Sequence, residues 1–259
     1  MQGYPPSNSQ DDEYGQPAPG WPRRRPPLAQ PLDELDEIDA SIPEPVRVRY
    51  RGSGSDPTFG LLVGFAVSIG LIPIAPEYGD VRYVAGWSAL ALFSVLGWLL
   101  GETERIGKER VDNLVWGIVF GLILAVPMML VGGSTLATTV NLLFRSDIDG
   151  VMRGLPAGAV FGLLVFAMPL AETLFFRGLV QYQRAFWLVG LIASAWSLLL
   201  FFPMLEVTRF PAVGLIIGSA LIMVNMTYSY VRQRNGLAAA WLCQVTVNVV
   251  LLFIPYVLS

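Results

Sequence analysis

Long apolar stretches alternate with short polar connections from residue 58 to the C-terminus. Each stretch holds about 17–23 residues, which is the length of helix that crosses a hydrocarbon core about 30 Å thick. The pattern predicts seven membrane-spanning helices, over residues 58–76, 83–101, 113–132, 155–177, 186–205, 211–231 and 237–258. Because only helices and closed barrels satisfy the backbone in lipid, the predicted fold class is all-α. We expect a multi-pass transmembrane helix bundle with a four-helix core formed by the last four spans.

The overall composition supports this assignment. Hydrophobic residues make up 54% of the 259 residues, charged residues make up 14%, and the mean hydropathy is +0.55. A soluble domain carries about 25% charged residues, so this composition excludes a soluble globular protein. Residues 134–154 have too short an apolar run to cross a bilayer, and we expect part of this segment to form a short interfacial helix.

The N-terminal region has a different composition. Ten of the nineteen prolines and many acidic residues fall within residues 1–45, with few apolar residues to bury. Residues 1–55 are therefore predicted to be a disordered, Pro/acid-rich tail without the apolar run of a signal peptide, and residues 56–259 to be the transmembrane domain. The net charge of −3 comes largely from the tail, and no nucleic-acid partner is predicted.

The basic residues predict an orientation. With the N-terminus inside, 13 of the 17 Lys and Arg residues lie on the inner side of the bundle and 4 lie on the outer side. Lys and Arg concentrate in the cytoplasmic connections of membrane proteins. The asymmetry predicts seven spans, a cytoplasmic N-terminus and an external C-terminus, with membrane lipid as a partner of the whole bundle.

One carboxylate, Glu172, lies inside a predicted span. Placing an ionised carboxylate at the bilayer centre costs roughly 2.5–3.5 kcal/mol, so Glu172 is a functional candidate by default. Arg177 lies about 140° further round an α-helix, so the two side chains are not expected to face each other. We expect Glu172 to find partners on other helices and Arg177 to extend to the interface. No second charge is expected deep in a span.

Other polar residues in the spans predict contacts between helices. Gln244 and Asn248 are four residues apart and therefore share one helix face. Ser194, Ser197 and Thr227 are expected to hydrogen-bond neighbouring helices. Small residues allow close helix approach, and two pairs have the four-residue spacing of a close-packing face: Gly158 with Gly162, and Gly214 with Gly218.

The residue inventory excludes several kinds of chemistry. The chain has no histidine and one cysteine, Cys243. A histidine-ligated zinc site, a Ser–His triad and a disulfide framework are therefore excluded. No metal and no other cofactor is predicted.

Two motifs in the last four spans resemble those of one protein family. The segment Glu172–Gly178 reads Glu-Thr-Leu-Phe-Phe-Arg-Gly. It resembles the first motif, Glu-Glu-x-x-x-Arg followed by Gly, of the CPBP family, the CAAX-prenyl-protease and bacteriocin-processing intramembrane endopeptidases. The segment Gln244–Asn248 resembles the third motif of that family, His-x-x-x-Asn. The resemblance covers about residues 155–258 and is a motif hypothesis that structural context must support.

The resemblance implies an intramembrane glutamic endopeptidase of a bacterial plasma membrane. Glu172 would activate water and Asn248 would donate a hydrogen bond to the oxyanion. The resemblance gives the candidate catalytic residues Glu172, Thr173, Arg177, Gln244 and Asn248. Thr173 stands where the family has a second Glu, and Gln244 stands where it has a histidine. The second motif, Phe-x-x-x-His, aligns with residues 198–202, 201–205 or 202–206, and none of these segments contains a histidine.

These departures decide the predicted function. Losing an oxyanion donor costs about 10²–10³ in rate, and losing a general acid or base costs about 10²–10⁴. We therefore predict a CPBP-like membrane protein with impaired or no proteolytic activity, which binds a membrane-embedded peptide or protein partner in the former substrate cavity. Two alternatives stay open. One is an active glutamic endopeptidase that uses Glu172, and the other is a small transporter or channel in which Glu172 is a proton or ion site.

Overall fold

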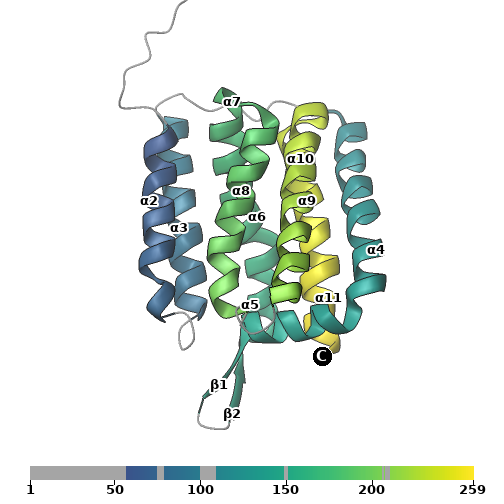
Figure 1. The fold of residues 1–259 in the computed structure, drawn as a ribbon. Coiled ribbons are helices and arrows are strands. Elements are labelled where there is room, and N and C mark those ends of the chain that lie inside the picture. Colours follow the sequence, from purple (N-terminus) through teal and green to yellow (C-terminus); the bar gives the residue numbers. More distant parts are fainter. Residues whose placement is uncertain (1–56, 75–78, 100–108, 149–150, 206, 208–210) are drawn as a thin grey trace, which may run out of the picture. The chain divides into compact units, whose positions relative to one another are not determined.

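The computed structural model describes residues 57–74, 79–99, 109–148, 151–205, 207 and 211–259. The predicted tail, residues 1–55, lies outside the described residues, as does Glu206 of the third alignment for the second motif. The described residues after Tyr50 belong to one compact unit, which is an antiparallel bundle of helices (Figure 1).

The first half of the bundle contains three helices and a short hairpin. Helix α2 (Pro57–Gly70) is followed by one turn of 3-10 helix, η4 (Ile72–Ile74), and then by α3 (Gly79–Leu99) and α4 (Val111–Phe144). Strands β1 (Arg145–Ile148) and β2 (Val151–Gly154) pair antiparallel and connect α4 to the second half.

The second half contains the helices that carry the two motifs. The first is a continuous helical rod made of α5 (Ala157–Gly162), η5 (Leu163–Ala167), α6 (Met168–Glu172), η6 (Thr173–Val180) and α7 (Gln181–Gln183). Helix α8 (Phe186–Phe201) with η7 (Phe202–Met204) and helix α9 (Pro211–Asn235) follow. The last rod consists of α10 (Leu237–Asn248), η8 (Val249–Phe253) and α11 (Ile254–Leu258). Segments η5, η6 and η8 are π-helical.

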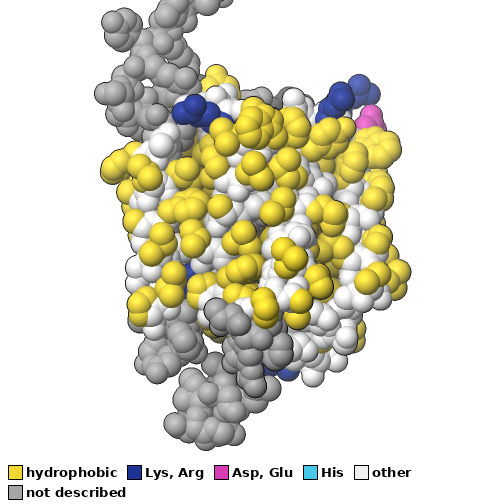
Figure 2. Space-filling model, in the orientation of Figure 1, with side chains coloured by type: hydrophobic (Ala, Val, Ile, Leu, Met, Phe, Trp, Pro, Cys, Tyr) yellow, Lys and Arg dark blue, Asp and Glu magenta, His cyan; other side chains and the backbone are white. Residues whose placement is uncertain are grey.

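The predicted all-α transmembrane bundle is confirmed. Six helices in the described part of the chain are long and apolar enough to cross a membrane, and α2 is a shorter apolar helix. The first predicted span, residues 58–76, is therefore the weakest, because α2 has 14 residues before the chain enters η4. Figure 2 shows hydrophobic side chains covering the visible side of the bundle, with Lys and Arg mainly at its ends. This apolar side surface fits contact with membrane lipid.

The segment 134–154 differs from its prediction. Residues 134–144 do not form a separate short helix but continue α4, which is 34 residues long and contains Pro127. Figure 1 shows the C-terminal part of α4 turning across one end of the bundle before the β1–β2 hairpin. Polar residues are tolerated in this part of the helix because it lies at the end of the bundle rather than along its lipid-facing side.

Close helix packing occurs at glycines other than the first predicted pair. A Cβ atom at Gly117 would collide with the backbone of Ala239, and a Cβ at Gly121 would lie 2.7 Å from the Thr246 side chain. These two glycines let α4 lie against α10. By contrast, nothing lies within 4 Å of a Cβ at Gly158 or Gly162, so the prediction for this pair is wrong. The second pair does pack, with Gly214 against Val207 and Gly218 against Phe202 and Leu198.

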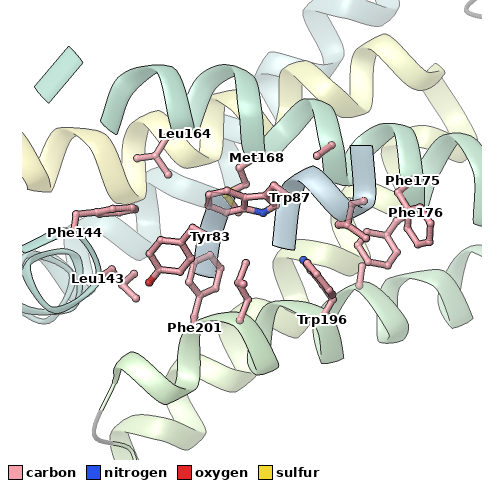
Figure 3. Close-up of a cluster of buried hydrophobic side chains, with 14 of the residues drawn as sticks. Tyr83, Trp87, Leu143, Phe144, Leu164, Met168, Phe175, Phe176, Trp196 and Phe201 are labelled. Atoms are coloured by element: carbon pink, nitrogen blue, oxygen red, sulfur yellow. The ribbon is translucent and has the colours of Figure 1, made fainter. Parts of the chain in front are cut away.

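Aromatic side chains fill the interior between α3, α8 and the α5–α7 rod. Figure 3 shows Tyr83, Trp87 and Phe201 packed against one another. The Tyr83 ring centroid lies 5.4 Å from that of Trp87 and 5.8 Å from that of Phe201. Trp196, which is fully buried, packs against Phe176 further along the same cluster. This cluster holds Trp87 and Trp196 in fixed positions beside the centre of the α5–α7 rod.

Candidate functional site

Glu172 is the centre of the candidate site. Its side chain is 1% exposed and lies close to the middle of the α5–α7 rod, because the helix continues past Arg177 to Gln183. Trp87 Nε1 donates a hydrogen bond to Glu172 Oε1 at 3.1 Å, and Gln244 Nε2 donates to Glu172 Oε2 at 2.6 Å. The indole nitrogen of Trp196 is buried and has no hydrogen-bond partner in the described part of the chain. Two uncharged donors from two other helices therefore hold the carboxylate.

Thr173 and Gln244 form a second link between the same helices. Thr173 Oγ1 donates to Gln244 Oε1 at 3.0 Å, while the amide nitrogen of Gln244 is bonded to Glu172. A threonine hydroxyl needs an acceptor and a carboxylate needs a donor, so these two contacts together orient the Gln244 amide. The structure thus brings Glu172, Thr173 and Gln244 together in one buried network.

Arg177 is fully buried, which corrects the expectation that it extends to the interface. The reason is the local helix geometry. Segment η6 begins at Thr173 and is π-helical, so a residue bonds to the one five positions away rather than four. Because a π-helix has more residues in each turn, the angle around the helix axis between Glu172 and Arg177 is smaller than it would be in an α-helix.

Arg177 is held by α9. Its Nη2 donates to Asn225 Oδ1 at 2.7 Å, and its guanidinium lies 5.2 Å from the ring centroid of Tyr228. Asn225 Nδ2 in turn donates to Ser197 Oγ at 3.2 Å and to Leu221 O at 3.0 Å. The remaining nitrogens of Arg177, Nε and Nη1, are buried and have no hydrogen-bond partner in the described part of the chain.

Asn248 is oriented toward the α5–α7 rod rather than toward Glu172. Its Nδ2 donates to Leu164 O at 2.9 Å and lies 3.5 Å from the sulfur of Met168. Both amide hydrogens therefore have neighbours on that rod. An oxyanion role for Asn248 would require its amide to leave these contacts.

A cavity of about 730 Å³ reaches Glu172. Its wall is formed mainly by apolar residues of α4, α8, α9, α10 and η8. The other polar residues that line it are Thr135, Thr139, Ser197, Ser219, Asn225, Tyr228 and Asn248. Ser197, Asn225, Tyr228 and Asn248 are as deeply buried as Glu172, at 3% exposure or less. Phe201 and Leu205, the first and last positions of the second alignment for the second motif, also line the cavity. The site is therefore not confined to the last four spans, because α3 supplies Trp87 and α4 supplies one wall.

The cavity opens through the lipid-facing side of the bundle. Three residues that line it are also exposed on that side: Val131 of α4 is 92% exposed, and Ile216 and Met223 of α9 are 68% and 47% exposed. Glu172, Asn225 and Asn248 at the inner end are at most 3% exposed. An apolar molecule in the bilayer could therefore reach the carboxylate between α4 and α9.

The predicted polar contacts between helices are correct for one of three residues. Ser197 accepts the hydrogen bond from Asn225 of α9. Ser194 instead donates to Gly190 O, and Thr227 donates to Met223 O. Both acceptors are carbonyls of the residue's own helix. Serine and threonine in apolar helices often bond in this way to the carbonyl four residues earlier.

Two important residues were not predicted. Trp87 was not singled out because nothing in the pattern of α3 relates it to Glu172, 85 positions away. Arg82 is one of the four basic residues that the predicted orientation places on the outer side, and it is fully buried near the start of α3. Its Nη2 donates to Leu199 O and to Ser68 O at 3.5 Å, near the C-terminal ends of α8 and α2. The available signal was the position of Arg82 directly before a predicted apolar span.

The site offers little to a metal ion. The described residues contain no group of three His, Cys, Asp or Glu side chains that could hold one. A carboxylate with indole and amide donors is suited to binding a hydrogen-bond donor at the end of an apolar cavity.

The fold and the site together define a multi-pass membrane protein with a buried carboxylate and a cavity open to lipid. No family model matches the chain, and neither the curated proteins nor the solved structures contain a match.

Proposed function

We propose that the protein is a CPBP-like membrane protein with impaired or no proteolytic activity, which binds an apolar membrane component in the cavity beside Glu172. The proposal combines the motif resemblance with one observation. The carboxylate at the end of the cavity receives its hydrogen bonds from Trp87 and Gln244, whose indole and amide groups cannot serve as a general acid or base near neutral pH.

Peptide hydrolysis needs proton transfer as well as a carboxylate. An attacking water must lose a proton, and the leaving amine must gain one. The chain has no histidine, and Thr173 and Gln244 occupy the positions of the family's second carboxylate and third-motif histidine. Each missing acid or base costs about 10²–10⁴ in rate, so the losses together leave little hydrolysis.

The cavity supports the binding half of the proposal. Its apolar wall and its opening between α4 and α9 favour entry of an apolar molecule from the bilayer. The wall is mainly apolar, and an ion that leaves water for an apolar environment carries a large desolvation cost, so this geometry favours binding of an apolar molecule over ion transport.

Comparison of protein termini in cells tests the absence of cleavage. Membranes from cells that express the wild-type chain or Glu172→Gln are analysed by mass spectrometry of new N- and C-termini. We expect the two sets of termini to be the same. A terminus that is present with the wild type and absent with Glu172→Gln would overturn the proposal.

Analysis of molecules that co-purify with the protein tests binding. We expect wild type in mild detergent to retain an apolar molecule that Ala220→Trp does not, because Ala220 lines the cavity and a tryptophan there would fill part of it. Leu215→Trp is the matched control, since Leu215 lies on the same helix, is 73% exposed and does not line the cavity. Equal retention by all three proteins would count against binding at this site.

The second candidate is an active glutamic endopeptidase. It is favoured by one observation, namely that Glu172 lines the cavity with the Gln244 amide 2.6 Å from its Oε2. In that case the terminus comparison yields a product that depends on Glu172, and Gln244→Ala reduces its amount at least tenfold.

The proposed orientation is a cytoplasmic N-terminus in a plasma membrane. Its support is the excess of Lys and Arg on the predicted inner side. Fusions of alkaline phosphatase and of green fluorescent protein to the C-terminus test it. We expect the phosphatase fusion to be active and the fluorescent fusion to be dark, and the reverse pattern would contradict the orientation.

A further inference from the structure

We infer that the occupant of the cavity is a single-chain lipid with an uncharged, hydroxyl-bearing head group, bound with its hydroxyl at Glu172 and its chain directed to the opening between α4 and α9. This inference rests on the proposed function and adds the chemical class of the ligand. Four observations carry it: the volume of the cavity, the polarity of its wall, the charges at its inner end and the position of its opening.

The volume favours one small ligand. The cavity of about 730 Å³ lies within the range of about 300–1,000 Å³ that is typical of sites for one small organic ligand. A transmembrane helix, which is about 10–12 Å across and about 20 residues long, is much larger than such a ligand.

The wall disfavours an extended peptide. Every residue of such a peptide carries a backbone donor and an acceptor, and unpaired groups are costly in an apolar environment. The polar groups of the cavity are few, and the amides of Asn225 and Asn248 already have partners. A chain of methylene groups needs no hydrogen bonds and is stabilised by burial against the apolar wall.

The charges at the inner end select the head group. Glu172 is 1% exposed and Arg177, five positions further along the same rod, is fully buried, so the inner end holds one acidic and one basic side chain away from water. A charged head group would add an uncompensated charge in a low-dielectric interior. A carboxylate can accept about four hydrogen bonds, and Trp87 and Gln244 provide two. A hydroxyl donor therefore fits better than an anion or a cation.

The opening places the chain. Val131 and Ile216 line the cavity and are exposed to lipid, whereas Glu172 lies at the buried end. A lipid chain that enters from the bilayer between α4 and α9 therefore points its far end to the opening and its head group to Glu172.

Photolabelling of the full-length protein in detergent tests the inference. The probe is an eighteen-carbon alcohol that carries a diazirine in its chain, and labelled residues are located by mass spectrometry. We expect labels on residues 127–139 of α4 and 216–224 of α9. The competitors share one chain and differ in the head group: oleyl alcohol, oleyl sulfate and oleyl trimethylammonium. We expect oleyl alcohol to compete at a concentration at least tenfold lower than the two charged compounds.

Two variants make the test specific. Ala220→Trp should reduce labelling at least fivefold, because the new side chain fills the cavity. Leu215→Trp should leave labelling unchanged, because it alters only the lipid-facing surface of the same helix. Glu172→Gln removes the negative charge and leaves Arg177, so the preferred competitor should change from oleyl alcohol to oleyl sulfate.

The outcomes separate this inference from the proposed function. If the three competitors are equivalent but Ala220→Trp still prevents labelling, the cavity binds apolar chains and only the head-group inference is wrong. If oleyl sulfate or oleyl trimethylammonium is preferred by the wild type, the inference is also wrong. If wild type and Ala220→Trp are labelled alike, both the inference and binding in the cavity are overturned.

Discussion

Arg82 and Arg177 are both fully buried, but their surroundings differ. Arg82 donates to the backbone carbonyls of Ser68 and Leu199, near the C-terminal ends of two helices. Arg177 donates to a side chain, Asn225, and lies five residues after Glu172 on the same helical rod. In each arginine, two nitrogens have no hydrogen-bond partner in the described part of the chain. The number of unpaired nitrogens therefore does not distinguish the two residues.

The comparison shows that burial of a charge does not by itself identify a functional site. The C-terminal end of a helix carries a partial negative charge and unpaired carbonyls, which a cation stabilises. Arg82 is therefore explained by the fold. Arg177 donates a hydrogen bond to Asn225, and Asn225 lines the cavity. The charge of Arg177 therefore lies one residue away from the place where a ligand would bind. Four changes test this difference, and they follow in order of expected effect.

Removal of the Glu172 carboxylate should have the largest effect. Glu172→Ala leaves Arg177 buried without an opposite charge and leaves two donors without an acceptor, so we expect the free energy of unfolding to fall by about 3–5 kcal/mol. Denaturation in mixed detergent micelles measures this. Glu109→Ala is the control, because Glu109 accepts hydrogen bonds from the Ala238 and Ala239 backbone at the start of α10 and should cost about 1 kcal/mol. Equal losses would show that Glu172 is an ordinary structural carboxylate.

Removal of the Arg82 charge should destabilise the protein without changing its site. Arg82→Met loses charge-assisted hydrogen bonds at two helix ends, and we expect a loss of about 2–3 kcal/mol in the free energy of unfolding. Photolabelling at a temperature where the variant is folded should match the wild type within about twofold, since Arg82 does not line the cavity. A change in head-group preference would contradict the assignment of Arg82 to the fold.

A double-mutant cycle should separate the two arginines. We expect Glu172→Gln and Arg177→Met to be coupled by about 1–2 kcal/mol, because each removes the charge that compensates the other. Glu172→Gln and Arg82→Met should be additive within about 0.5 kcal/mol. Both cycles use the free energy of unfolding in the same detergent. Coupling of similar size in the two cycles would indicate a general effect of charge rather than a local pair.

The smallest change in the free energy of unfolding should come from replacing either of two serines of α8, Ser194 and Ser197, which are equally buried at 2% exposure. Ser197→Ala removes one of the two acceptors of the Asn225 amide, the one that joins α9 to α8, and should cost about 1 kcal/mol. Ser194→Ala removes a bond within its own helix and should change the free energy of unfolding by less than about 0.5 kcal/mol. If the two variants are equally stable, the Asn225–Ser197 contact does not support the position of Arg177.

Most of the fold could be predicted from the sequence, because the length of an apolar stretch directly limits what it can form in lipid. The long helices occur where the apolar stretches predicted them. The extension of α4 to Phe144 and the hairpin after it were not predicted, since polar residues at a helix end have no fixed period. Close packing at Gly117 was missed for a similar reason, because glycine spacing does not show which helix lies opposite.

The site was only partly predictable. Glu172 stood out because a carboxylate is costly in a span, and the motif resemblance related it to Gln244, which the structure places 2.6 Å away. The resemblance remains a prediction. The angle between Glu172 and Arg177 was wrong because it assumed α-helical geometry, while the chain forms a π-helix from Thr173 to Val180. Three π-helical segments lie next to Glu172 and Asn248, a feature that is frequent at functional sites.

The sequence by itself determined that the chain is a multi-pass helical membrane protein and that one carboxylate lies inside it, because both follow from the cost of polar groups in lipid. Tertiary structure alone decided which groups meet that carboxylate. Trp87, Gln244 and the cavity wall of α4 come from segments far apart in the chain, and their contacts depend on how helices rotate and pack. Helix rotation is set by side chains that interlock across many residues, so no local pattern of apolar and polar positions specifies it.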